Sequence, residues 1–313
     1  MSPLPTFADV QAAARRLEGV TIRTPLLENE RVNRALGGRL FIKAECLQRT
    51  GSFKLRGAYN FLAAMTDADR AKGVVGWSSG NHAQGLAEAA RLMGVKATIV
   101  MPSDAPALKV ANTRASGAEV ILYDRVKESR EAIGHGIAEK TGATIVPPYD
   151  HPWILTGQGT AGIEIAEQAK AAGVTLDAVA APCSGGGLAT GVALGVQGLS
   201  PTTAVHAGEP AGFDDLARSL ASGTKQKNDK LSGSICDALL APTPGDVTFP
   251  LAQKVLGPGL VVSDDEVLDA MELAFREFKL VVEPGGAVAL AAALTGKLPV
   301  KGRAVAVVCS GGN

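Results

Sequence analysis

Strand-like and helix-like segments alternate through the middle of the chain, and this alternation limits the fold more than any other feature. The predicted strands occupy residues 73–78, 97–101, 119–123 and 144–146. The predicted helices between them occupy residues 82–93, 106–116 and 126–140. Strands joined through helices form crossover units, in which the strands lie parallel and the helices cover the sheet. The sequence therefore predicts an α/β fold with a mainly parallel sheet.

The alternation resumes after residue 150 and predicts a second sheet. Strands are predicted there at residues 177–181, 203–207 and 303–309, and helices at 156–172, 187–196, 263–279 and 284–295; one more strand is predicted near the N-terminus, at residues 40–45. Residues 219–245 predict an irregular, exposed segment. We expect two open, twisted, mainly parallel sheets covered by helices. Residues 1–67 and 150–313 would form a large domain, and residues 68–149 a small one.

Composition narrows the classes of function. The 313 residues carry 31 Lys and Arg against 31 Asp and Glu, so neither nucleic acid nor a membrane is an expected partner. No apolar run is long enough to span a bilayer, and the N-terminus lacks the pattern of a signal peptide. The four cysteines are scattered without a CxxC pair, which favours a reduced, cytoplasmic protein over a disulfide framework or a zinc site.

Lys54 is the first candidate catalytic residue. It stands between Phe53 and Leu55, shortly after Gly51. Burial on an apolar wall would favour the neutral amine, which is a nucleophile for aldehydes and forms Schiff bases. A single lysine of this kind is more often structural than catalytic, so the interpretation depends on other segments.

Two loops that follow predicted strands are candidate ligand sites. Ser78 to Gly85 opens a helix, whose free N–H groups suit a carboxylate or a phosphate, although polar turn residues also cap ordinary helices. Ser184 to Gly191 begins with Ser-Gly-Gly-Gly and predicts a phosphate cradle, with a flexible turn as the alternative. It matches neither a Walker loop nor a dinucleotide fingerprint. Ser310 ends the last strand, where a small residue also suits a chain end.

Together these segments resemble the pyridoxal-phosphate enzymes of the tryptophan-synthase-β type, or fold type II. Within that family they are most similar to the serine/threonine dehydratase and serine racemase branch. The matching segments are residues 52–58, 78–82, 157–160, 184–188, 283–284 and 310–313. The resemblance implies a homodimer with pyridoxal 5′-phosphate in the cleft between the two domains.

The resemblance also implies roles around the cofactor. Lys54 would hold it as a Schiff base, Phe53 and Asn81 would flank its ring, and Ser310 would bond the ring nitrogen. The phosphate would be held by the backbone N–H groups of Ser184, Gly185, Gly186, Gly187 and Leu188. Because a serine hydroxyl does not protonate the ring as an aspartate would, the ring is a modest electron sink, which suits elimination.

The same resemblance implies substrate and metal sites. The substrate would lie against Ser78, Ser79, Asn81, His82 and Arg130. Ser79 would be an acid/base opposite Lys54, as in racemases, and His82 would orient the loop. Arg130 would reach a second carboxylate, although an arginine there could equally lie on the surface.

A divalent cation, magnesium or calcium, would bind Glu209, Asp215 and the carbonyl of Phe213. Without the resemblance, a solvated acidic loop is the simpler interpretation. The chain departs from the pattern at Tyr149, near the phosphate, and in the segment 235–238, and the second of these departures bears on the choice of substrate.

The predicted function is a lyase that removes water and ammonia from a small β-hydroxy amino acid, namely L-serine, L-threonine or 3-hydroxyaspartate. An amino-acid (serine) racemase on the same site is the enzymatic alternative. A phosphate-ligand-sensing α/β binding protein is the non-enzymatic one.

Overall fold

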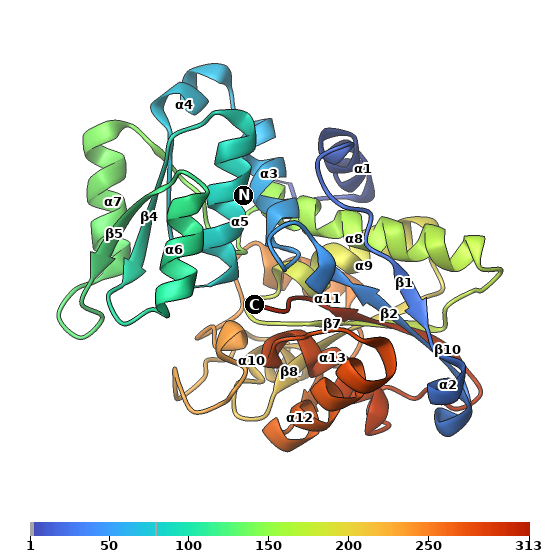
Figure 1. Cartoon of the computed structure of the whole chain (residues 1–313). Coiled ribbons are helices and arrows are strands. Elements are labelled where there is room, and N and C mark those ends of the chain that lie inside the picture. Colours follow the sequence, from blue (N-terminus) through green and yellow to red (C-terminus); the bar gives the residue numbers. More distant parts are fainter. Residues whose placement is uncertain (1–2, 79) are drawn as a thin grey trace.

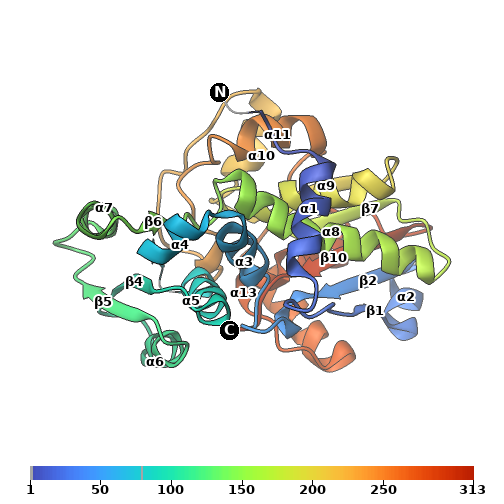
Figure 2. The same cartoon turned by 90° about the horizontal axis from the view of Figure 1, so that it is seen from above.

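The computed structural model describes residues 3–78 and 80–313 and contains two sheets (Figures 1 and 2). The six-stranded sheet has the order β1-β2-β10-β7-β8-β9, in which only β1 runs antiparallel to its neighbour. Its strands are β1 (Leu26–Glu28), β2 (Arg39–Ala44), β7 (Ala178–Pro182), β8 (Ala204–Pro210), β9 (Leu260–Val262) and β10 (Ala304–Cys309).

The four-stranded sheet has the order β5-β4-β3-β6, and its pairs are all parallel. Its strands are β3 (Val74–Trp77), β4 (Ala97–Pro102), β5 (Glu119–Tyr123) and β6 (Thr144–Ile145). The prediction of two mainly parallel sheets is confirmed. The division into domains at residues 68 and 149 stays a prediction.

Helices cover both faces of each sheet. Around the six-stranded sheet lie α1 (Phe7–Leu17), α2 (Glu30–Leu36), α8 (Pro152–Ala171), α9 (Gly187–Leu199), α10 (Asp215–Ser222), α11 (Thr248–Val255), α12 (Asp264–Leu273) and α13 (Pro284–Leu294). Around the four-stranded sheet lie α4 (Asp67–Lys72), α5 (Asn81–Met93), α6 (Ala107–Ala115) and α7 (Arg130–Thr141). Helix α3 (Lys54–Ala64) packs on both α5 and α8 and so joins the two parts.

Small residues let the helices lie close to the sheet and to each other. On one face of the six-stranded sheet, α13 buries five alanines between Ala287 and Ala293, together with Val288 and Leu290. On the other face, α8 and α9 approach so closely that a Cβ at Gly162 would lie 2.3 Å from the Val192 carbonyl oxygen. These contacts fix α9, and therefore the glycine loop at its start, against the sheet.

The structure differs from the sequence prediction at several element boundaries. Helix α7 begins at Arg130 and not at residue 126, because residues 124–128 form a turn and Ser129 caps the helix by accepting from Ala132 N–H. The segment 219–245, which the sequence predicted to be exposed, is exposed only in part. Asn228 within it is buried and donates to Asp215. The short elements β1, α2, α4, α10, α11 and β9 were not predicted.

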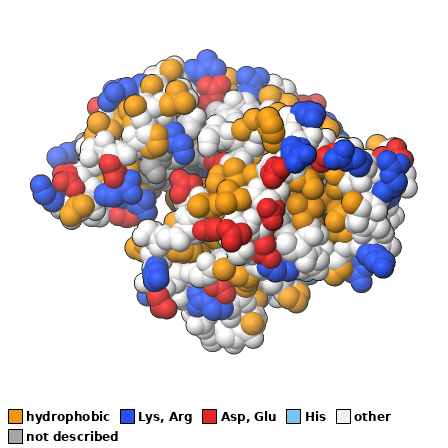
Figure 3. All heavy atoms as spheres, turned by 60° about the horizontal axis from the view of Figure 1, so that its bottom comes forward, with side chains coloured by type: hydrophobic (Ala, Val, Ile, Leu, Met, Phe, Trp, Pro, Cys, Tyr) orange, Lys and Arg blue, Asp and Glu red, His pale blue; other side chains and the backbone are white. Residues whose placement is uncertain are grey.

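Charges of both signs alternate over the face in Figure 3, which shows no large area of one sign. Within the described residues, no helix combines the length and the apolar character that crossing a membrane requires.

Candidate active site

One cavity of about 270 Å³ opens between the two sheets and collects most of the predicted site residues. The predicted residues in its lining are Phe53, Lys54, Ser78, Asn81, His82, Arg130, Ser184, Gly185, Gly186, Gly187, Leu188 and Ser310. They come from the starts of α3, α5, α7 and α9 and from the end of β10, so carboxyl ends of strands and amino ends of helices meet here. Their roles remain predictions, but the structure brings them together.

Lys54 is the first residue of α3, and its half-buried side chain lies in the cavity wall. Its Nζ donates to the Pro148 carbonyl at 2.8 Å and lies 5.2 Å from the centre of the Phe53 ring. Burial lowers the pKa of Lys54 to about 8, although the charge of Glu283 acts in the opposite direction. About a tenth of the amine is then neutral at pH 7, against less than about a thousandth for an ordinary lysine, and the neutral amine is the form that acts as a nucleophile or a base.

The glycine loop before α9 is closed on one side by Tyr149. A Cβ at Gly185 would lie 2.1 Å from the Tyr149 ring, and one at Gly187 would lie 3.1 Å from Tyr149 Cβ. Gly186 also has a φ of 98°, which an L side chain rarely adopts. Thr248 fixes the loop from behind by donating to the Gly185 carbonyl at 2.7 Å. The backbone here is a preformed cradle at a helix N-terminus, which fits a phosphate group.

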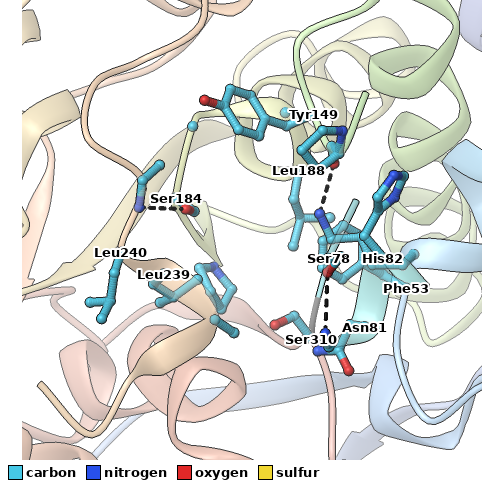
Figure 4. Close-up of a pocket in the computed structure, with 18 of the residues that line it drawn as sticks. Phe53, Ser78, Asn81, His82, Tyr149, Ser184, Leu188, Leu239, Leu240 and Ser310 are labelled. Carbon is cyan, nitrogen blue, oxygen red and sulfur yellow. Dashed lines mark hydrogen bonds between the residues drawn. The ribbon is translucent and has the colours of Figure 1, made fainter. Parts of the chain in front are cut away.

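The loop before α5 presents Ser78, Asn81 and His82 to the same cavity (Figure 4). His82 is buried, and its Nε2 lies 3.0 Å from the Val146 carbonyl. Burial, assisted by the charge of Lys54, lowers the pKa of His82 to about 3. His82 is therefore neutral and donates through Nε2, which fixes the start of α5. Ser79, the predicted second acid/base, lies outside the described residues.

Asn81 is held at both ends of its amide. Its Nδ2 donates to Glu283 Oε1 at 2.5 Å, and its Oδ1 accepts from Asn313 Nδ2 at 2.7 Å. One N–H of Asn81 therefore remains for a ligand. Ser310 lies beside Asn81 (Figure 4), and its backbone carbonyl accepts from Phe53 N–H at 3.1 Å, which ties the end of β10 to the start of α3.

Glu283 received no role from the sequence, yet it is buried in the cavity wall at the N-cap of α13. Burial raises the pKa of Glu283 to about 7. The dipeptide Glu283-Pro284, which matches the family pattern, was the sequence feature that could have indicated this position. Lys109, Asp237 and Gln158 also line the cavity without having been predicted.

Arg130 lies in the cavity wall at the start of α7, with its side chain 48% exposed. Its Nε pairs with the adjacent Glu131 at 2.8 Å. The guanidinium is thus neither buried nor turned wholly to the surface, and it faces the same space as Lys54 and Ser78.

The predicted cation ligands lie apart from this cavity, where β8 leads into α10. Both oxygens of the Glu209 carboxylate accept backbone N–H groups, from Leu216 at 3.0 Å and from Ala217 at 2.7 Å. Asp215 Oδ1 accepts from Asn228 at 2.6 Å, whereas its buried Oδ2 has no partner among the described residues. Burial raises the pKa of Asp215 to about 6, and burial together with Asp215 raises that of Glu209.

Of the four oxygens of this pair, only Asp215 Oδ2 is unpaired among the described residues, and a proton or a hard cation there would satisfy it. Phe213, also buried, lies between them in the chain. Across residues 3–78 and 80–313, however, no three His, Cys, Asp or Glu side chains gather into a group that could hold a metal.

A buried charge network supports the start of α3 from behind. Arg56, fully buried, donates to Glu45 through Nε and Nη2 at 2.7 Å each and to Glu164 through Nη1 at 2.7 Å. Lys43 donates to Glu164 at 2.6 Å. Two cations and two carboxylates therefore balance in the core, two residues along the helix from Lys54.

Comparison with known proteins agrees with this geometry. The family model described as "Pyridoxal-phosphate dependent enzyme" matches residues 17–311. The chain is 44% identical to L-threo-3-hydroxyaspartate ammonia-lyase from Pseudomonas sp. over 99% of this chain and 96% of that protein. It is 39% identical to serine racemase from Schizosaccharomyces pombe, over 99% and 94% of the two chains.

Among solved structures, the T.th. threonine deaminase superimposes with a TM-score of 0.92 at 43% identity, over 99% of this chain and 98% of that one. The predicted fold type and family are thereby confirmed. The chain belongs to the family of pyridoxal-phosphate dependent enzymes.

Proposed function

We propose that the protein is a pyridoxal-phosphate dependent ammonia-lyase that dehydrates β-hydroxy amino acids, with 3-hydroxyaspartate as its preferred substrate. The observation that carries the choice of substrate is Arg130 in the same cavity as Lys54. A second carboxylate buried without a cation would cost several kcal/mol. A guanidinium can bind it bidentately. The relatives named L-threo-3-hydroxyaspartate ammonia-lyase, from Pseudomonas and Saccharomyces cerevisiae, support the same choice.

The proposed roles follow the positions of the side chains. The cofactor, when bound, withdraws electrons from the Cα–H bond of the amino acid joined to it. Ser184 to Leu188 bind its phosphate, while Asn81 and Ser310 orient its ring. The start of α5 binds the substrate carboxylate. Lys54, as a neutral amine, takes the Cα proton. Loss of that proton and of the β-hydroxyl gives, after hydrolysis, a keto acid and ammonia.

Steady-state kinetics on wild type and Arg130→Ala test this proposal. Loss of a charge-assisted contact should lower kcat/KM for 3-hydroxyaspartate about 10- to 100-fold. Turnover of L-serine should change by less than about threefold. Arg91→Ala is the matched control, because Arg91 pairs with Glu88 on the surface of α5. A wild type that ignores 3-hydroxyaspartate, or an Arg130→Ala variant that loses all substrates equally, would contradict the assignment.

Racemisation is the second candidate activity, favoured by the relatives named serine racemase. It needs proton transfer on both faces of the cofactor, for which Ser79 is the proposed partner of Lys54. Ser79→Ala should then suppress racemisation of serine far more than elimination from the L-isomer, as chiral product analysis would measure. Equal loss of both activities would contradict the two-base assignment. Membership of an enzyme family argues against a phosphate-sensing binding protein.

We further propose a magnesium or calcium ion at Glu209, Asp215 and the Phe213 carbonyl, for which the unpaired oxygen of Asp215 is the support. A cytoplasmic homodimer is proposed from the family resemblance and from four cysteines that are all free and buried. Residues 68–149 are proposed as the small domain, since the four-stranded sheet uses only strands within that range.

A further inference from the structure

One wall of the cavity is a loop to which no proposed step assigns a role. We call residues 237–242 the wall segment; all six of them line the cavity, and five of the six are apolar. The segment begins with the short helix η2 (Asp237–Leu239), which packs against the start of α13, where a Cβ at Gly285 would lie 3.1 Å from Leu239 Cγ. The wall segment is therefore fixed at its beginning, and the position of its end depends on the contacts of Ala241.

Ala241 is held by hydrogen bonds on two sides. Its N–H donates to Ser184 Oγ at 3.2 Å (Figure 4), and its carbonyl accepts from Asn228 Nδ2 at 2.8 Å. Asn228 also donates its backbone N–H to the Pro242 carbonyl at 2.9 Å. Among the described residues, the Ser184 hydroxyl makes the only hydrogen bond between the wall segment and the glycine loop at residues 184–188. Loss of this hydroxyl would therefore remove the link between the two.

Ser184 joins the wall segment to the proposed phosphate cradle. Its backbone begins the cradle, while its side chain holds Ala241. The next residue is fixed by the protein itself, since the Gly185 carbonyl accepts from Thr248 Oγ1 at 2.7 Å and from Gly245 N–H at 3.1 Å. A phosphate bound by the N–H groups of the loop would restrict the backbone of Ser184 as well, and with it the hydroxyl that accepts from Ala241. Ordering of the cradle would thus pass to the wall segment.

We infer that Ser184 is a positioning residue, whose hydroxyl ties the wall segment to the glycine loop so that a bound cofactor phosphate holds this wall of the cavity in place. The inference rests on the proposed function, which assigns the phosphate to the same loop, and adds how the cofactor shapes the space for the amino acid. Coupling of this kind is reciprocal. Loss of the Ser184 hydroxyl should therefore loosen the wall segment and also weaken cofactor binding.

The test is amide hydrogen exchange at Ala241, resolved to single residues by mass spectrometry with electron-transfer fragmentation. In the cofactor-free protein, Ser184→Ala should speed this exchange about fivefold, the factor that one ordinary hydrogen bond contributes. Loading with pyridoxal phosphate should slow the exchange at least about fivefold in the wild type and far less in Ser184→Ala. Ser184→Thr, which keeps the acceptor, should restore both behaviours. Thr141→Val is the matched control, because the Thr141 hydroxyl also accepts a backbone N–H at 3.2 Å, from Ala143, on an exposed turn after α7.

In the loaded enzyme, Ser184→Ala should raise KM for the amino acid more than it lowers kcat, because the wall segment contains none of the residues proposed to transfer a proton. Absorbance titration should show cofactor binding that is about fivefold weaker. Far-UV circular dichroism and the melting temperature verify that each variant is folded. If Ser184→Ala does not fold, Ser184→Gly, which also lacks the hydroxyl, takes its place.

Two results would overturn the inference. One is equal exchange at Ala241 in the cofactor-free wild type and Ser184→Ala. The other is exchange at Ala241 in the wild type that loading with the cofactor leaves unchanged. The measurement on cofactor-free protein is independent of the proposed function, whose failure would instead appear as a protein that gains no cofactor absorbance.

Discussion

Replacing Arg56 by methionine should destabilise the protein strongly, because Arg56 neutralises a fully buried Glu45. Two Arg56–Glu45 bonds of 2.7 Å would be lost, and among the residues that the structure describes only Thr24 would still donate to Glu45, at 2.5 Å. Glu164 would keep Lys43 at 2.6 Å. Breaking a buried ion pair by removing one partner costs about 3 to 5 kcal/mol. That is a large part of the total of roughly 5 to 15 kcal/mol by which a domain is stable.

The loss should depend on pH. In the wild type, burial raises the pKa of Glu45, but the charge and hydrogen bonds of Arg56, together with Lys43 and Thr24, outweigh it and hold the pKa below its ordinary value. Without Arg56, burial leads, and the folded-state pKa of Glu45 should rise above the unfolded one. A carboxyl whose pKa is higher in the folded than in the unfolded state destabilises the folded protein at pH values above its unfolded-state pKa. This destabilisation disappears as the pH falls and the carboxyl becomes protonated. The penalty should therefore be larger at pH 8 than near pH 5.

Urea unfolding at pH 8 and at pH 5, monitored by circular dichroism, would measure the loss in the free energy of unfolding. Arg34→Met is the control, because Arg34 pairs with Glu30 on the surface and should cost at most about 1 kcal/mol. Adding Glu45→Gln to Arg56→Met should recover part of the loss. A cost for Arg56→Met no larger than that of the control, or one independent of pH, would refute the reasoning.

Three further predictions concern the sites. Gly185→Ala should weaken cofactor binding, measured by absorbance titration, because its methyl group would meet the Tyr149 ring; Tyr149→Ala in the same chain should restore part of the affinity. Excess chelator should lower the melting temperature, and magnesium or calcium should restore it, because an ion bound only by the folded state stabilises that state; an Asp215→Asn variant should not respond, and an equal response would reject the site. The acid limb of the kcat profile should follow Lys54 near pH 8 and persist in His82→Gln, because the pKa of His82 is about 3 and the imidazole stays neutral; a limb that disappears with His82 would contradict this.

The regular parts of the fold could be predicted because their signals are local. The apolar runs of β3, β4 and β10 and the capping box of Ser263 and Glu266 on α12 lie within short windows of sequence. The three-residue strands β1 and β9 have too few residues to show a period, and they exist because they pair with longer neighbours. Asn228 is buried through its contact with Asp215, and no local pattern encodes that contact.

The residues of the candidate site also fall into two groups, those with a local sequence signal and those placed only by tertiary contacts. Lys54 and the loops after β3 and β7 carry chemistry within a few adjacent residues. Glu283 matters because it meets Asn81, 202 positions away in the chain. The network of Arg56, Glu45, Glu164 and Lys43 likewise joins three separate segments, and each of these residues taken alone resembles an ordinary surface charge. Tertiary contacts, and not local sequence, decide their burial.

Lys54 is the residue proposed to bind the cofactor, and peptide mapping tests this role most directly. Protein loaded with pyridoxal phosphate is reduced with borohydride, digested and examined by mass spectrometry, with Lys54→Ala treated in parallel. The phosphopyridoxyl group should be found on the peptide that contains Lys54 and be missing from the variant. A label on another lysine of the cavity or core, such as Lys109 or Lys43, or no label at all, would contradict it.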